Sequence, residues 1–251
     1  MTLKRAVLRC CSSWGCIEMK HETQTIAGIR CEVYGTKSDT LLLQPVDDHD
    51  LEMLDQETEA IEKEQGSAFC LCAFRVPDWN RDLTPWGAPP VFGEIPFGDG
   101  AGKTLEFVMK ELLPEVGANA SLRMIGGYSL AGLFALWAAY NSDAFCGVAG
   151  VSPSVWYPGW GDYIRNSHIR VGQVYLSLGD REEFTKNPQM ALVGDLIRLQ
   201  YARMQADPVV EHVVLEWNKG NHFAEPGIRT AKGFAWLLKQ QAGKMHANLP
   251  V

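Results

Sequence analysis

Residues 124–140, MIGGYSLAGLFALWAAY, run from an apolar strand pattern into an apolar helix pattern, with Ser129 at the junction. The residues around this serine are small: Gly126, Gly127, Ala131 and Gly132. A sharp strand-to-helix turn needs small neighbours because the strand and the helix would otherwise collide, and such a turn exposes its serine. Residues 127–131, GYSLA, match the G-x-S-x-G pattern of that turn except for alanine in the last place. We interpret Ser129 as a candidate nucleophile; the alternative is that the small residues serve close packing alone.

Apolar runs alternate with longer amphipathic stretches along the rest of the chain. Strand patterns occupy residues 24–34, 39–44, 67–76, 121–126, 145–151, 172–178 and 211–217. Helix patterns occupy residues 50–64, 102–116, 130–141, 188–206 and 226–241. Several strand patterns are continuously apolar, as expected for strands that helices cover on both faces. This alternation predicts a three-layer α/β protein with a mostly parallel central sheet between two layers of helices.

The composition argues against several classes of function. The 251 residues are 46% apolar and 21% charged, with a net charge of −7, which is typical of a globular protein. Because Lys and Arg are not clustered, we expect neither nucleic acid nor an anionic membrane surface as a partner. The apolar stretch 130–140 is too short to span a bilayer, and Arg9 interrupts any signal-peptide pattern. The seven cysteines favour reduced thiols and a cytoplasmic location.

The N-terminal segment holds four of these cysteines: Cys10, Cys11, Cys16 and Cys31. They lack C-x-x-C spacing and a nearby pair of histidines, so no metal site is expected. We expect residues 1–18 to be a poorly ordered extension and residues 19–251 to form a single domain. The oligomeric state does not follow from the sequence.

A serine nucleophile needs a base, and in proteins with this strand–serine–helix turn the chain order is serine, acid, histidine. His222 lies in NKGNHFAEPG, between a strand pattern and a helix pattern, where open α/β sheets place their sites. The other downstream histidines are poorly placed by position or by order: His168, His212 and His246. We therefore predict that His222 is the base; the alternative is an ordinary loop histidine.

The acid is expected in the segment LSLGDREEF, after the strand pattern 172–178. This segment offers Asp180, Glu182 and Glu183, and a surface turn is often acidic without any role in catalysis. We favour Glu182, with Asp180 as the second choice, and the sequence leaves the three open.

Stabilising a developing oxyanion requires two aimed N–H groups. One is expected from Leu130, directly after the serine, and the other from the segment that follows the strand pattern 39–44. Pro45 has no N–H, so the second donor is Gln44 or Val46, and we favour Val46.

Two irregular segments, residues 77–101 and 152–168, are rich in Pro and Gly and hold half of the eight tryptophans: Trp79, Trp86, Trp156 and Trp160. Long aromatic loops of this kind are usually functional, so we interpret these side chains as walls of a substrate pocket. The alternative is that they fasten the loops to the body. Arg81 is a candidate partner for a substrate carboxylate, although an ion pair with Asp78 or Asp82 is the simpler interpretation.

Together these residues resemble the esterase D and enterochelin-esterase-like group of α/β-hydrolases. The matching segments are ELLPEV, GGYSLAGLFALWAAY, AFCGVAGVSPSVW, LSLGDREE and GNHF, and the resemblance covers about residues 24–240. It implies the α/β-hydrolase fold and a serine hydrolase that uses Ser129, an acid near Glu182 and His222, with no metal or organic cofactor. It also implies that WNRDLTPW is a substrate-side loop. Gln44-Pro45 departs from the Asp-Gly or His-Gly usual in the group.

The expected reaction is hydrolysis of a small-molecule carboxylic ester through an acyl-serine intermediate. The tryptophans favour an aromatic or flat, partly apolar group in the substrate. Transfer of the acyl group to an alcohol is an alternative, because it would use the same intermediate. A binding protein built on a hydrolase scaffold is a further alternative, since fold does not guarantee function.

Overall fold

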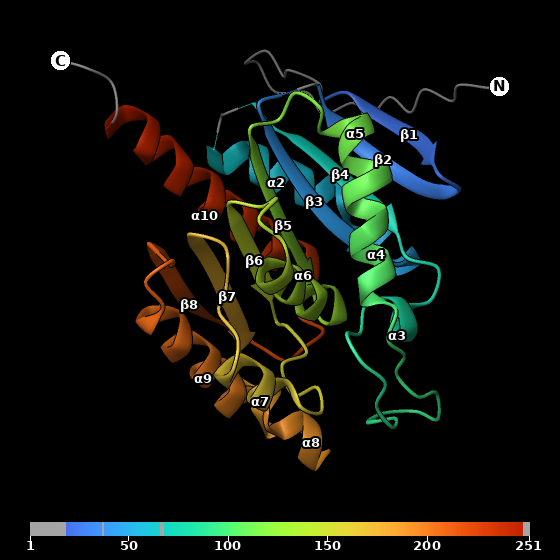
Figure 1. Ribbon diagram of the computed structural model, residues 1–251, viewed down its shortest axis with the longest axis vertical. Helices are drawn as coiled ribbons and strands as arrows, with labels where there is room; N and C mark the ends of the chain where they lie inside the picture. The colour runs from blue at the N-terminus through green and yellow to red at the C-terminus, as the bar shows by residue number, and fades with distance from the viewer. Residues whose placement is uncertain (1–18, 37, 66–67, 248–251) are drawn as a thin grey trace.

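The computed structural model describes residues 19–36, 38–65 and 68–247, so the extension expected at residues 1–18 lies outside the described residues. One eight-stranded sheet runs through the molecule in the order β1-β2-β4-β3-β5-β6-β7-β8 (Figure 1). Its strands are β1 (His21–Ile26), β2 (Ile29–Gly35), β3 (Thr40–Val46), β4 (Cys70–Arg75), β5 (Leu122–Tyr128), β6 (Gly147–Val151), β7 (Gln173–Gly179) and β8 (His212–Asn218). The β1–β2 and β2–β4 pairs are antiparallel and the others are parallel, which confirms the mostly parallel sheet.

Helices cover both faces of this sheet. They are α1 (Asp48–Leu51), α2 (Leu54–Gln65), α3 (Trp79–Asp82), α4 (Ala101–Phe107), the π-helix η1 (Val108–Leu112), α5 (Leu113–Val116), α6 (Leu130–Asn141), α7 (Trp160–Arg165), the 3-10 turn η2 (Glu182–Phe184), α8 (Pro188–Ala191), α9 (Val193–Ala206) and α10 (Pro226–Ala247). Helices α2 and α10 pack together over one face, and α4, α6, α7 and α9 contribute to the core on the other (Figure 1). The prediction of three layers is therefore confirmed.

The structure corrects the sequence patterns in three places. The single strand predicted over residues 24–34 is a hairpin, because Ala27 and Gly28 adopt φ values of 45° and 85° and turn the chain back. The helix predicted over residues 102–116 is divided by the π-helix η1. The segments expected to be irregular contain the short helices α3 and α7.

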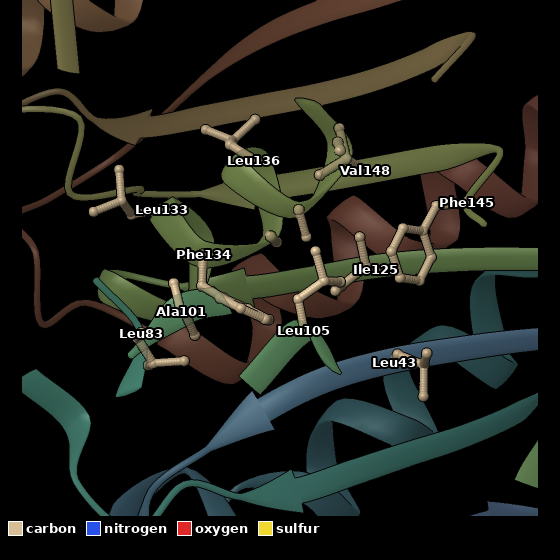
Figure 2. Close-up of a cluster of buried hydrophobic side chains, with 14 of the residues drawn as sticks. Leu43, Leu83, Ala101, Leu105, Ile125, Leu133, Phe134, Leu136, Phe145 and Val148 are labelled. Carbon is tan, nitrogen blue, oxygen red and sulfur yellow. The ribbon is translucent and has the colours of Figure 1, made fainter. Parts of the chain in front are cut away.

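Helix α6 carries the chain away from Ser129 and is buried on nearly all sides. Its side chains Leu133, Phe134 and Leu136 lie among residues of β5, β6 and α4 (Figure 2). Burial of an aliphatic or aromatic side chain of this size contributes about 1.5–3 kcal/mol. Because α6 is packed from several directions, the serine at its start has a fixed position relative to the sheet.

Among the helices of residues 19–36, 38–65 and 68–247, none is long and apolar enough to cross a membrane.

Candidate active site

Ser129 occupies the corner between β5 and α6 with φ 58° and ψ −121°, a conformation that costs energy for a residue other than glycine. The corner is too tight for larger neighbours. A Cβ on Gly127 would lie 2.7 Å from the Ala131 Cβ, and a Cβ on Gly132 would lie 2.8 Å from the Gly127 carbonyl oxygen. The small residues around Ser129 are thus required by this turn, and the turn holds the hydroxyl at the carboxyl edge of the parallel strands.

His222, on the turn after β8, contacts Ser129, and Glu182, on the turn after β7, contacts His222. The Ser129 Oγ lies 3.1 Å from the His222 Nε2, and the His222 Nδ1 lies 2.7 Å from the Glu182 Oε2. An ionised carboxylate only accepts hydrogen bonds, so the proton of the neutral imidazole is on Nδ1 and the Ser129 hydroxyl donates to Nε2. The His222 side chain is 25% exposed and that of Glu182 is 4% exposed. The three residues therefore form a continuous chain from a buried carboxylate to the hydroxyl of the half-buried Ser129.

The second oxygen of Glu182 is also fully engaged. Its Oε1 accepts hydrogen bonds from the Ser152 hydroxyl and the Gly179 N–H, both at 2.7 Å, and from the Arg229 Nη1 at 3.3 Å. Burial raises the pKa of Glu182, but the hydrogen bond from His222, the positive charge that His222 carries when protonated, and the bonds from Ser152 and Gly179 outweigh the effect of burial. The pKa of Glu182 therefore lies below its usual range, and the carboxylate stays ionised beside His222.

The two other carboxylates that the sequence left open have different partners. Asp180 accepts a hydrogen bond from the Gly220 N–H at 2.8 Å, which ties the acid turn to the histidine turn. Glu183 forms a two-pronged ion pair with Arg198 at 2.8 and 2.9 Å. Of the three, Glu182 is the one that contacts His222.

Arg229 and Tyr128 are parts of this site that the sequence reasoning missed. The Tyr128 hydroxyl donates to the backbone carbonyl oxygen of His222 at 2.6 Å, and the Arg229 Nη1 donates to that hydroxyl at 3.2 Å. Burial raises the pKa of Tyr128 to about 12, so the phenol stays a donor. Arg229 is 2% exposed and lies in the first turn of α10. The available signal was an arginine seven residues after His222, inside a helix with an apolar face.

Ser154 is a further neighbour of Ser129 that the sequence reasoning missed, although its segment SPSVW is part of the resemblance. Its Oγ lies 3.3 Å from the Ser129 Oγ, and its N–H donates to the Ser129 carbonyl oxygen at 3.0 Å. Ser154 is 1% exposed.

The two residues expected to supply oxyanion donors lie on α6, the helix that follows Ser129, and on β3, a strand that pairs with β5. Leu130 is the first residue of α6, where N–H groups have no acceptor inside the helix. Val46 is the last residue of β3, and the β3–β5 pairing ends three residues earlier, at Leu43 and Ile125. Beyond this point β3 and β5 are no longer paired with each other as they approach Ser129. The assignment of both donors stays a prediction.

The tryptophans mostly fasten loops. Trp160 is fully buried and its Nε1 donates to the Gln200 Oε1 at 3.1 Å, which corrects its prediction as a pocket wall. Trp156 is 5% exposed, and the half-buried Trp86 donates its Nε1–H to the Pro158 carbonyl oxygen at 2.8 Å. Trp79, half-buried at the start of α3, packs against the same core, and its role toward a substrate stays a prediction.

Arg81 is engaged with its acidic neighbours. Its Nε donates to Asp82 at 2.8 Å, and its Nη1 lies 3.7 Å from Asp78. This is the ion pair that the sequence offered as the simpler interpretation.

Two exposed phenylalanines follow the residues of this site. Phe223, directly after His222, is 85% exposed, and Phe184, at the end of η2, is 76% exposed. Large exposed aromatic side chains beside a site often mark a surface for apolar ligands. Within the described part of the chain, no group of three or more His, Cys, Asp or Glu side chains could hold a metal ion.

No protein-family model matches the sequence, and no curated protein matches it either. Solved structures do match in fold. Siderophore hydrolase EstA from Aspergillus nidulans is 18% identical with a TM-score of 0.68, covering 91% of this chain and 99% of that chain. Siderophore hydrolase EstB from the same organism is 16% identical with a TM-score of 0.62, covering 93% and 98%.

An IroE-like serine hydrolase from Shewanella oneidensis is 15% identical with a TM-score of 0.68, covering 88% of this chain and 80% of that chain. At this level of identity the likeness concerns the fold. The chain therefore has the α/β-hydrolase fold, as its resemblance to the esterase D and enterochelin-esterase-like group implied.

Proposed function

We propose that this protein is a serine hydrolase that cleaves carboxylic esters through an acyl-serine intermediate. The observation that carries the proposal is the chain of contacts from the Glu182 carboxylate through His222 to the Ser129 hydroxyl, at 2.7 and 3.1 Å. A serine hydroxyl becomes nucleophilic when a neighbouring base can take its proton and a third group orients that base. All three groups meet at the edge of the sheet where this fold places its sites.

In the proposed reaction, the Ser129 Oγ attacks the ester carbonyl carbon while its proton passes to the His222 Nε2. The imidazolium, held at Nδ1 by Glu182, gives that proton to the alcohol oxygen as the C–O bond breaks. Water then attacks the acyl-serine while His222 takes its proton, and the proton returns to Ser129 as the carboxylic acid leaves. The N–H groups of Leu130 and Val46 stabilise the oxyanion of both tetrahedral intermediates.

The proposed substrate is a small-molecule ester with an apolar portion. Phe223 and Phe184 supply exposed aromatic surface on the two turns that carry His222 and Glu182. Two of the similar structures are named siderophore hydrolases. A substrate panel therefore starts with a siderophore trilactone and includes aryl and alkyl esters of increasing acyl length.

A fluorophosphonate tests the proposal because it reacts covalently with an activated serine and needs no knowledge of the substrate. We expect one equivalent to modify Ser129, located by peptide mapping, and we expect the His222→Ala variant to lose at least a hundredfold in labelling rate. His168→Ala is the matched control, since His168 is 79% exposed and pairs with Asp207 away from Ser129. It should label at the rate of the unchanged protein.

Folded protein that does not react at Ser129 would contradict the proposal and favour a binding protein on this scaffold. If labelling succeeds, product analysis with competing alcohols then separates hydrolysis from acyl transfer.

A further inference from the structure

Arg229 connects to His222 by three routes. Its Nη1 lies 3.3 Å from the Glu182 Oε1, and Glu182 holds the imidazole ring. The same Nη1 donates to the Tyr128 hydroxyl, which donates to the backbone carbonyl of His222. The Nη2 donates to the carbonyl oxygen of Lys219 at 3.0 Å, on the loop that precedes His222. One buried guanidinium thus braces the ring, the backbone and the loop of the histidine.

We propose that Arg229 is a positioning residue that also sets the lower pH limit of the site by sharing the Glu182 carboxylate with His222. This inference rests on the proposed function. In a triad without such a neighbour, the carboxylate stabilises the imidazolium with its whole charge. Here the positive charge of Arg229 also interacts with the Glu182 carboxylate, so the carboxylate stabilises the imidazolium less. The base is consequently free of its proton, and able to accept the serine proton, at lower pH.

The charged and titratable groups that face the imidazole come from three elements. Glu182 follows β7, Tyr128 ends β5 with its ring centroid 5.1 Å from that of His222, and Arg229 lies in the first turn of α10. The turns after β7 and β8 also carry charged residues that are exposed to solvent, where their influence is screened: Asp180, Arg181, Lys219 and Glu225. Among these groups, Arg229 is the buried cation.

The test measures the pH dependence of fluorophosphonate labelling, which requires no natural substrate. Removal of the buried positive charge of Arg229 favours the imidazolium. The acid limb of the rate profile should therefore move to higher pH by about one unit in Arg229→Met. At a pH on that limb, the labelling rate should fall about tenfold. Arg229→Lys keeps the charge and should keep the limb in place.

Lys232→Met is the matched control. Lys232 lies one turn further along α10 and pairs with Glu216 and Asn218, so its loss removes the same charge from the same helix without touching Glu182. Its acid limb should coincide with that of the unchanged protein. If Arg229→Met does not fold, as judged by circular dichroism, Arg229→Gln replaces it, because glutamine is neutral and keeps one N–H donor group.

A lowered rate with an unmoved acid limb in the neutral variants would overturn the inference and leave Arg229 a merely structural role. That outcome is distinct from failure of the proposed function, which would appear as absent labelling of Ser129 in the unchanged protein.

Discussion

The Ser129 hydroxyl has two hydrogen-bonding neighbours, and the direction of each bond follows from the ionised state of Glu182. Because the carboxylate fixes the His222 proton on Nδ1, the Ser129 hydroxyl donates to Nε2 and has only lone pairs left. The Ser154 hydroxyl, 3.3 Å away, must then donate to the Ser129 Oγ. Such a bond holds the Ser129 hydroxyl in one rotamer and, in the proposed reaction, would stabilise its oxygen as the proton leaves.

We therefore expect Ser154→Ala to lower the fluorophosphonate labelling rate about three- to tenfold, as expected for the loss of one neutral hydrogen bond worth about 0.5–1.5 kcal/mol. Thermal stability should change little because the hydroxyl is small. Ser142→Ala is the control, since Ser142 is also buried but follows the far end of α6. An unchanged rate in Ser154→Ala would show that the hydroxyl does not act on the nucleophile.

The sequence allows some residues of the candidate site to be predicted much better than others. Ser129 and His222 could be predicted because a strict local turn and a chain order constrain them. Three carboxylates within four positions could not be separated, because one residue along a turn changes the direction of a side chain completely. Arg229 could not be predicted, since its contacts with Tyr128, Ser152 and Glu182 exist only once α10 has docked against residues that lie 47 to 101 positions earlier in the chain.

The corner between β5 and α6 is the element on which the site depends, and its geometry leaves no room for a methyl group. We expect Gly127→Ala to lower the free energy of unfolding by about 1–3 kcal/mol, because the new Cβ would collide with Ala131 at 2.7 Å. Urea unfolding measures this loss. The matched control is Gly102→Ala in α4, where a Cβ meets nothing within 4 Å and should stabilise the helix by about 0.5–1 kcal/mol. Equal effects of the two substitutions would contradict this account of the turn.

Elements were predictable where a pattern was long and uniform, as for α6, whose predicted and observed bounds coincide. They were not predictable where one or two residues change the direction of the chain. The β1–β2 hairpin depends on the positive φ of Ala27 and Gly28, and a run of strand-forming residues conceals that turn. Likewise, α7 depends on contacts of Trp160 with a distant helix, which its Pro- and Gly-rich segment does not reveal.

Across the whole molecule, the layer formed by α2 and α10 encloses an acidic group that no cation pairs with in the described contacts. Glu57 is buried against Gln44, whose amide lies 3.4 Å from its carboxylate, and one oxygen of each side chain has no partner. Burial raises the pKa of Glu57 well above its ordinary value, only partly offset by Gln44, and the nearby Asp50 raises it further. The folded protein therefore holds a proton that the unfolded chain releases at lower pH.

It follows that Glu57 makes the folded state less stable as the pH rises above the ordinary glutamate pKa. We expect Glu57→Gln to raise the free energy of unfolding by about 1–3 kcal/mol at neutral pH, because an amide can satisfy Gln44 without a proton. The gain should shrink as the pH approaches 4. Denaturant titrations at several pH values measure it, with the exposed Glu59→Gln on the same helix as control. A gain in the free energy of unfolding that does not depend on pH would contradict the raised pKa of Glu57.

The position of α10 in the chain has a consequence for synthesis of the protein. Ser129 and the strand before it are made more than ninety residues ahead of His222, and Arg229 follows later still. Because a protein chain is synthesised from its N-terminus, the serine corner is translated before the proposed base, His222. A ribosome-bound chain that stops short of residue 222 carries a serine hydroxyl without its proposed base, so the proposed centre is complete only after the turn between β8 and α10 has been made.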